Sequence, residues 1–195
     1  MRPTMKRLLA RTWLKLNGWK TFGTIDHDKF VMIAAPHTSN WDLIYMLAVG
    51  WEMNVKIRWL GKHTIFRPPF GWIFRRLGGI PVDRRAHHNL VEQAAQHLRE
   101  ADAMVLAVPP AGTRSARPYW KSGFYWIAHT AGVPIALGFL DYGKREGGVG
   151  GFFTPTGDVH KDMDVLREFY ADKRGKIPKN ESRIRLREED REEAA

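Results

Sequence analysis

Two residues in the stretch His37-Thr-Ser-Asn-Trp-Asp42 have side chains suited to proton transfer. The imidazole of His37 can take up a proton near neutral pH. The carboxylate of Asp42 can accept a hydrogen bond from the other ring nitrogen, which sets the tautomer of the ring and stabilises its protonated form. The two residues are therefore a candidate pair of general base and orienting group.

The spacing of this pair constrains the backbone around it. Positions i and i+5 of one helix point about 140° apart, so His37 cannot reach Asp42 from within the same helix. We expect His37 in a loop after a buried strand, and Asp42 in the first turn of a helix at 41–52 that Ser39 or Asn40 caps. A purely structural explanation stays open, because the helix dipole favours an acidic residue near a helix N-terminus without any catalytic role.

Three further short motifs follow in order along the chain. They are Gly78-Gly-Ile-Pro-Val-Asp-Arg84, Gly112-Thr-Arg-Ser115 and Gly132-Val-Pro-Ile135. Together with the H-x4-D stretch they resemble the glycerolipid (lysophospholipid) acyltransferase family, over the region from about Phe30 to Leu140. One such motif is weak evidence, whereas four in order with suitable gaps are a strong indication.

The resemblance implies an acyltransferase. Such an enzyme moves a fatty acyl group from acyl-CoA or acyl carrier protein to the hydroxyl of a lysophospholipid, for example 1-acylglycerol-3-phosphate. His37 would deprotonate the acceptor hydroxyl, Asp42 would orient His37, and no acyl-enzyme would form. No cofactor is implied besides the acyl donor. We also expect no metal site, because His97 and His129 have no acidic partner at ligand spacing.

The resemblance also implies a set of substrate-binding residues. They are Lys62, Arg84, Gly112, Thr113, Arg114 and Lys121. Arg114 would bind the acceptor's phosphate through its guanidinium donors, Arg84 would be a second phosphate or transition-state contact, and Gly112 would let the backbone approach. Lys62 and Lys121 match less specific basic positions, and a solvated surface charge remains the alternative for both.

One residue departs from the family pattern. Where the family has Pro-Glu-Gly-Thr-Arg, this chain reads Pro110-Ala-Gly-Thr-Arg114, so alanine stands at the glutamate position, Ala111. The chain is an engineered inactive variant, a natural member with altered chemistry or a degenerate protein without activity. We favour the first explanation because His37 and Asp42 are retained. Under either of the first two, we expect poor activity of this chain.

Composition bounds the class of protein. A length of 195 residues suits a single domain with a substantial core. Lysine and arginine exceed aspartate and glutamate by 31 − 21 = 10, which favours anionic partners such as a membrane surface, a phosphorylated substrate, an acidic carrier protein or nucleic acid. The absence of cysteine excludes disulfides, a thiol nucleophile and a cysteine-ligated metal.

Residues 1–22 predict an amphipathic helix that binds a membrane interface. Its apolar residues at helical spacing are Met5, Leu8, Leu9, Trp13 and Leu16, and lysines and arginines fill the remaining positions. Such a helix suits an anionic membrane, although a helix packed on the domain with a solvated basic face is an equal alternative. Residues 66–76 place large aromatics among arginines, which fits a membrane surface, an acyl-chain pocket or ordinary packing.

The expected location follows from these segments. No apolar run approaches the ~20 residues needed to span a bilayer. No cleavable signal is evident near the N-terminus. We therefore expect a cytoplasmic protein that binds peripherally to the inner face of the cell membrane.

Strand-like and helical patterns alternate along the chain. Strands are predicted at 30–35, 55–60, 79–82, 104–108 and 134–141, and helices at 41–52, 88–101, 122–131 and 162–173. This alternation predicts an α/β fold, a single domain with a largely parallel mixed sheet covered by helices. The glycine-rich segment 143–157 predicts a loop leading into a short antiparallel piece. We expect the acyltransferase domain at 23–180 and a charged tail at 181–195, as an exposed helix or frayed.

Two other functions stay open. A catalytically inactive lipid-binding protein on the same fold would explain Ala111 directly. A basic nucleic-acid-binding protein would explain the charge, but no helix-turn-helix, zinc or RNP signature is present and His37 with Asp42 would have no role. We therefore expect no nucleic-acid partner. A serine hydrolase is less favoured still, because no G-x-S-x-G motif occurs.

Overall fold

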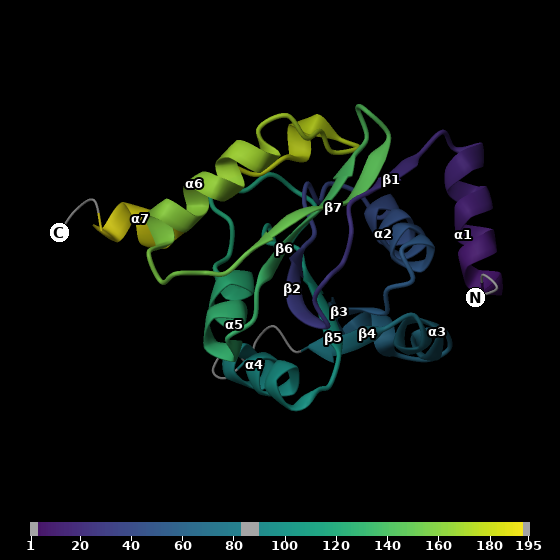
Figure 1. Ribbon diagram of the computed structural model, residues 1–195, viewed down its shortest axis with the longest axis horizontal. Coiled ribbons are helices and arrows are strands. Elements are labelled where there is room, and N and C mark those ends of the chain that lie inside the picture. Colours follow the sequence, from purple (N-terminus) through teal and green to yellow (C-terminus); the bar gives the residue numbers. More distant parts are fainter. Residues whose placement is uncertain (1–3, 83–89, 193–195) are drawn as a thin grey trace.

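A seven-stranded sheet runs through the computed structural model, which describes residues 4–82 and 90–192 (Figure 1). The strands are β1 Lys20–Phe22, β2 Lys29–Ile33, β3 Ile57–Lys62, β4 Gly79–Val82, β5 Met104–Val108, β6 Ile135–Asp141 and β7 Glu146–Phe153. Their order is β1-β7-β6-β2-β5-β3-β4. Among these strands, β6 and β7 pair antiparallel and the other neighbours pair parallel. The predicted α/β fold with a largely parallel mixed sheet is thus confirmed.

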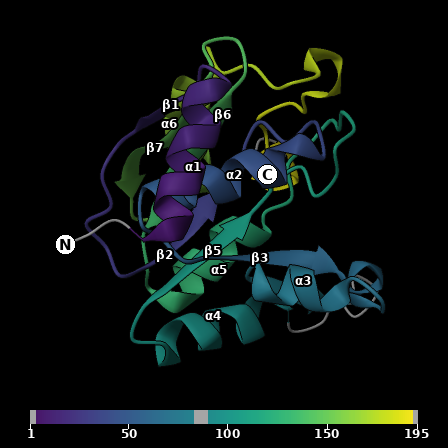
Figure 2. The ribbon, with the colours of Figure 1, turned by 90° about the vertical axis from the view of Figure 1, so that its right-hand side faces the viewer.

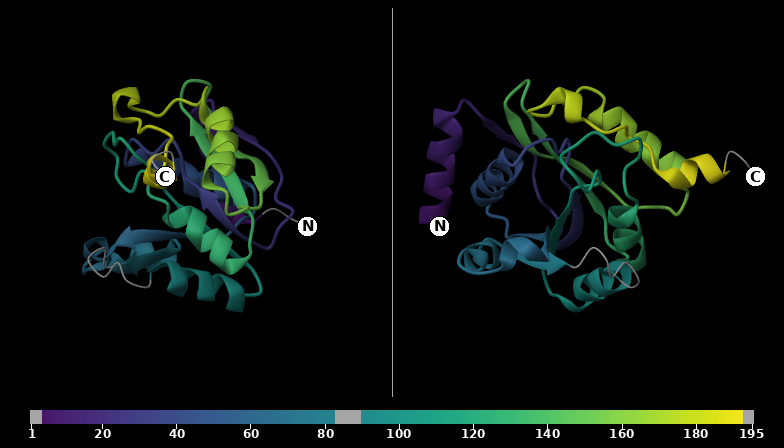
Figure 3. Two further views of the ribbon diagram at one scale, coloured as in Figure 1. Left: turned by 90° about the vertical axis from the view of Figure 1, so that its left-hand side faces the viewer. Right: turned by 180° about the vertical axis from the view of Figure 1, so that it is seen from behind.

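Helices cover both faces of the sheet. They are α1 Met5–Leu16, α2 Trp41–Glu52, α3 Gly71–Arg76, α4 Leu90–Glu100, α5 Gly123–Ala131, α6 Val159–Tyr170 and α7 Arg187–Glu192, with 3-10 turns at His63–Phe66 and Pro178–Asn180. Helices α4, α5 and α6 lie on one face and α2 lies on the other, as Figures 1 and 3 show. Helix α1 packs against the outer side of α2 (Figure 2).

Strand β2 is buried on both of its faces. Val31 and Ile33 pack with side chains of α4, α5 and α6, whereas Phe30 and Met32 pack with side chains of α2 and β3. Successive side chains of a strand point to opposite faces, so a strand covered on both sides must be apolar throughout. Each buried side chain of this size contributes roughly 1.5–3 kcal/mol. This central strand ends at the loop that carries His37.

The glycine-rich segment 143–157 is mostly strand rather than loop. A short antiparallel piece was expected after the loop, but β7 is eight residues long and pairs antiparallel with β6. The sequence did not predict β1, which pairs with the other side of β7. A Cβ on Gly148 would lie 1.9 Å from the carbonyl oxygen of Phe22, and one on Gly150 would lie 2.1 Å from the ring of Phe169. Glycine permits both close approaches. Because glycine has a low strand propensity, the sequence predicted a loop where the strand lies.

The C-terminal segment packs more closely than expected. Leu186 and Glu189 are 0% and 1% exposed. The carboxylate of Glu189 accepts hydrogen bonds from the backbone N–H of Leu186 and from the guanidinium of Arg167. The expectation that 181–195 would be exposed or frayed is therefore wrong for these residues, because pairing allows a charged side chain to be buried.

Helix α1 is amphipathic, as predicted. Ala10 and Leu14 are buried against the cluster that includes residues of α2. The apolar residues left exposed on the helix are Met5, Leu8, Leu9, Trp13 and Leu16. None of the helices within 4–82 and 90–192 has the length and hydropathy that crossing a membrane requires.

Candidate active site

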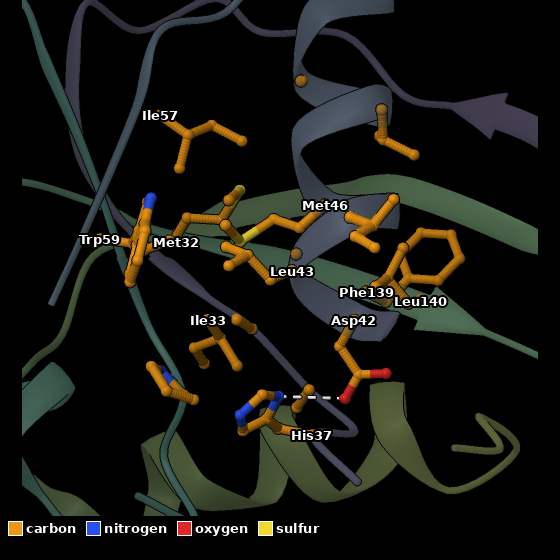
Figure 4. Close-up of a pocket in the computed structure, with 18 of the residues that line it drawn as sticks. Met32, Ile33, His37, Asp42, Leu43, Met46, Ile57, Trp59, Phe139 and Leu140 are labelled. Carbon is orange, nitrogen blue, oxygen red and sulfur yellow. Dashed lines mark hydrogen bonds and ion pairs between the residues drawn. The ribbon is translucent and has the colours of Figure 1, made fainter. Parts of the chain in front are cut away.

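The loop between β2 and α2 brings His37 and Asp42 together. Asp42 is the second residue of α2, and His37 precedes the helix. Nδ1 of His37 lies 3.0 Å from Oδ2 of Asp42 (Figure 4). The arrangement predicted from the spacing, with the histidine in a loop and the aspartate in the first helical turn, is therefore present.

Asp42 is almost fully buried and accepts several hydrogen bonds. Its Oδ2 accepts from the backbone N–H groups of Thr38 at 2.8 Å and Ser39 at 2.9 Å. Its Oδ1 accepts from the hydroxyl of Tyr142 at 2.9 Å. A carboxylate only accepts, so Nδ1 of His37 must carry the hydrogen in this pair. The other ring nitrogen, Nε2, then keeps the lone pair that can take a proton from a substrate.

Tyr142 was not among the site residues predicted from the sequence. It directly follows β6, 100 positions after Asp42. Burial, together with the charge of Asp42, raises the pKa of the Tyr142 hydroxyl, so the phenol stays protonated and donates. No local spacing indicates this contact. It becomes visible once the strand order is known, because residues that follow neighbouring parallel strands such as β2 and β6 meet at one edge of the sheet.

An apolar cavity of about 570 Å³ opens beside this pair and extends between α2 and the sheet. Residues of its wall include Met32, Leu43, Met46, Ile57 and Trp59. Figure 4 shows the His37–Asp42 pair at one end of this group and Ile57 at the other. Small-molecule pockets usually measure about 300–1,000 Å³. An apolar pocket with a base at its mouth suits a hydrocarbon chain whose reactive end reaches that base.

Two cationic residues stand at the same mouth. Lys62 ends β3 and Arg114 follows β5, and both exposed residues line the cavity. Strands β2, β5 and β3 are parallel neighbours, so their carboxyl ends meet at one edge and gather Lys62, Arg114 and His37 there. An accessible guanidinium is well suited to hold a phosphate.

The other predicted substrate-binding residues lie beside this mouth or outside the described chain. Gly112 has a φ of +63°, a left-handed conformation that favours glycine. The side chain of Lys121 packs over this turn, since a Cβ on Gly112 would lie 3.1 Å from its Cδ. Within the described residues, Gly112, Thr113 and Lys121 are not part of the cavity wall. Arg84 falls within 83–89, outside the described residues.

Ala111 lies in the turn before Arg114 and is 7% exposed. The carbonyl oxygen of the preceding Pro110 accepts a hydrogen bond from the backbone N–H of Lys121 at 2.8 Å. This bond ties the turn to the segment that leads into α5. Over 4–82 and 90–192, no group of three or more His, Cys, Asp or Glu side chains is placed to hold a metal ion.

Comparison with known proteins gives a family match and a similar fold. The Acyltransferase family model matches residues 23–136, more than half of the 195 residues. The fold is similar to the crystal structure of the 1-acyl-sn-glycerophosphate (LPA) acyltransferase PlsC from Thermotoga maritima, with a TM-score of 0.57 and 17% sequence identity. That similarity covers 86% of this chain and 74% of the other. No curated protein sequence matches the chain.

Proposed function

The chain belongs to the acyltransferase family, and we propose that it transfers a fatty acyl group from acyl-CoA or acyl carrier protein to the hydroxyl of a lysophospholipid such as 1-acylglycerol-3-phosphate. The observation that carries this proposal is the position of the His37–Asp42 pair at the mouth of the apolar cavity. The reaction joins a hydrocarbon chain to a hydroxyl, so it needs a base next to a place for the chain. The fold similarity to the Thermotoga maritima enzyme favours a phosphorylated acceptor.

His37 acts as the general base in this proposal. Its Nε2 takes the proton of the acceptor hydroxyl, and the oxygen attacks the thioester carbonyl of the donor, whose acyl chain lies in the cavity. The tetrahedral intermediate collapses with loss of the thiolate, which recovers the proton from the imidazolium. Asp42 keeps the hydrogen on Nδ1 and stabilises the charged ring during the reaction. Direct attack requires no acyl-enzyme.

Arg114 and Lys62 provide the positive charge that a phosphorylated acceptor requires. Both are exposed and line the cavity near His37. A guanidinium can hold two phosphate oxygens at once, which would set the distance from the acceptor hydroxyl to Nε2. Gly112, Thr113 and Lys121 support this loop rather than the cavity wall, and the role of Arg84 rests on the sequence motif alone.

Membrane binding by α1 would bring the cavity to its lipid substrates. Met5, Leu9 and Leu16 of α1 are 78%, 63% and 81% exposed, and Phe70 and Trp72, at the start of α3, are each 64% exposed. Figure 2 shows α1 and α3 on the same side of the molecule. Exposed apolar and aromatic residues with a net charge of +10 suit the cytoplasmic face of an anionic membrane.

Ala111 makes this chain a weak catalyst in our proposal. The motif that residues 110–114 resemble has glutamate at this position, and the methyl group of alanine offers neither charge nor a hydrogen-bond acceptor. A lipid-binding protein on the same fold is the second candidate, and the alanine at this position is the observation that favours it.

Acyl transfer from labelled donor to lysophosphatidic acid distinguishes the two functions. The assay compares this chain with Ala111→Glu, using acyl-CoA and acyl carrier protein as donors. Ala116→Glu is the matched control, because it adds the same charge at an exposed alanine in the same loop. Activity gained only with Ala111→Glu supports the proposal. If all three chains are silent with both donors while they still bind lysolipid, the lipid-binding function replaces it.

A further inference from the structure

The two carboxylate oxygens of Asp42 have different neighbours. Oδ2 accepts hydrogen bonds from Nδ1 of His37 and from two backbone N–H groups of the loop, at distances from 2.8 to 3.0 Å. Oδ1 receives the hydroxyl of Tyr142 at 2.9 Å. The donors from the loop therefore hold one side of the carboxylate, and a residue from the end of β6 holds the other.

The ring of Tyr142 is itself held on several sides. Trp19 and Tyr45 contact it edge to face, with ring centroids 5.0 and 5.7 Å away. Trp19 and Tyr45 stack on each other at 4.2 Å. Nζ of Lys176 lies 5.4 Å from the centroid of the Tyr142 ring. These contacts leave the hydroxyl aimed at Asp42.

Rotation of the Asp42 carboxyl group is the motion that this hydroxyl opposes. The torsion of an aspartate side chain about its last bond is broad, so one-sided hydrogen bonding leaves the plane of the group loosely defined. A donor on the opposite oxygen restricts the rotation and keeps Oδ2 directed at Nδ1 of His37. In other proteins, a group that hydrogen-bonds to the partner of a histidine helps to fix the orientation and the tautomer of the histidine ring.

We propose that Tyr142 is a positioning residue, which holds Asp42 so that His37 keeps its hydrogen on Nδ1 and presents Nε2 to the substrate. The contribution of Tyr142 to catalysis rests on the proposed function, whereas the effect of Tyr142 on the His37 ring does not. Tyr142 lies beyond residue 136, where the match to the family model ends. The charged and titratable groups that face it are Asp42 and Tyr45 from α2 and Lys176 from the segment after α6.

Tyr142→Phe tests this inference, with Tyr125→Phe as the matched control. The control removes the same kind of bond, because the hydroxyl of the buried Tyr125 donates to Oδ2 of Asp162 at 2.7 Å. Both substitutions keep the aromatic ring, so its packing is retained, and thermal melting verifies that each variant is folded. Proton–nitrogen correlation spectra of ¹⁵N-histidine-labelled protein report which ring nitrogen carries the hydrogen. The signals of His37 are assigned by their loss in His37→Gln.

The expected result is specific to the ring of His37. In the unmodified chain and in Tyr125→Phe, His37 shows the Nδ1–H form, whereas Tyr142→Phe shows an increased fraction of the Nε2–H form. An unchanged tautomer in folded Tyr142→Phe overturns the inference, because a purely structural hydroxyl would leave the ring as it was.

Kinetics separate this inference from the proposed function. In the Ala111→Glu chain, Tyr142→Phe should lower kcat about tenfold, the effect of losing one hydrogen bond to a charged group, and leave KM nearly unchanged. If the Ala111→Glu chain transfers no acyl group, the proposed function fails, and the tautomer of His37 still decides the role of Tyr142. A raised KM at unchanged kcat would overturn the positioning role.

Discussion

The backbone N–H of Ile177 donates a hydrogen bond to Oγ1 of Thr38 at 3.2 Å, so a segment near the C-terminus holds the loop that carries His37. The side-chain amide of Asn180 also reaches the carbonyl oxygen of Thr38, at 3.5 Å. Thr38 is 2% exposed, and a Cβ on Gly175 would lie 2.7 Å from its side chain. The loop is therefore enclosed by residues about 140 positions away in sequence.

Thr38→Val should destabilise the protein. Valine keeps the shape of threonine but leaves the N–H of Ile177 without its acceptor, at a cost of about 1–3 kcal/mol. Urea denaturation monitored by tryptophan fluorescence measures the free energy of unfolding. Thr130→Val, at an exposed position of α5, is the control and should change it little. Equal stability of the two variants would mean that the bond contributes nothing.

His37→Ala in the Ala111→Glu chain should lower turnover by about 10²–10⁴-fold, the usual contribution of a general base. Binding of lysolipid should change little, because the cavity wall is retained. Acyl-transfer rates and equilibrium binding are measured side by side. His97→Ala, on the exposed side of α4, is the control. A retained rate in His37→Ala contradicts the role of the base.

Arg114→Ala should raise KM for a phosphorylated acceptor about tenfold, because one charged hydrogen-bonding partner of the phosphate is lost. The Arg114→Ala variant and the protein that keeps Arg114 should use an uncharged acceptor, such as a monoacylglycerol, equally well. Arg117→Ala, at an exposed position a few residues later, is the control. A similar loss with both acceptors would place Arg114 in a structural role instead.

Met46→Trp should shorten the acyl chain that the protein accepts. Met46 lies in the cavity wall one helical turn beyond Asp42, so a larger ring there fills part of the 570 Å³. Competition between donors of different chain length measures the preference in the Ala111→Glu background. Val165→Trp, on the exposed side of α6, adds the same ring away from the cavity. An unchanged preference for acyl-chain length would show that the acyl chain binds outside this cavity.

Leu9→Glu combined with Leu16→Glu should weaken binding to anionic vesicles about tenfold, because two apolar side chains no longer enter the membrane interface. Both residues are exposed, so folding is retained, whereas deletion of α1 would uncover α2. Co-sedimentation with vesicles containing phosphatidylserine measures the binding. Val165→Glu on α6 is the control. Equal binding would favour a helix whose only role is packing.

Local patterns were enough to predict most of the sheet and the His37–Asp42 contact. The strand at 30–35 could be predicted from its continuous apolar run, because β2 is covered on both faces. The His37–Asp42 contact could be predicted because it depends on only six consecutive residues. Helix α2 was predicted with its observed bounds. These features share one property, which is that neighbours in sequence determine them.

Features that depend on strand order could not be predicted in this way. Tyr142 reaches Asp42 because β6 lies next to β2, and Ile177 reaches Thr38 because the chain returns over the same edge. The length of strand β7 was not predicted, for a related reason. Its glycines are explained by the close approach of Phe22 and Phe169, which come from distant parts of the chain.

Strand β6 is divided by the end of the family match at residue 136. The remainder of this fully buried strand carries most of the pairing with β7, and the residue that follows it is Tyr142. The region that matches the family model therefore ends inside the sheet, before β7 and Tyr142. A chimaera joined at the family boundary would cut through the inner strand β6, whereas a junction after Phe153 would transplant the whole sheet.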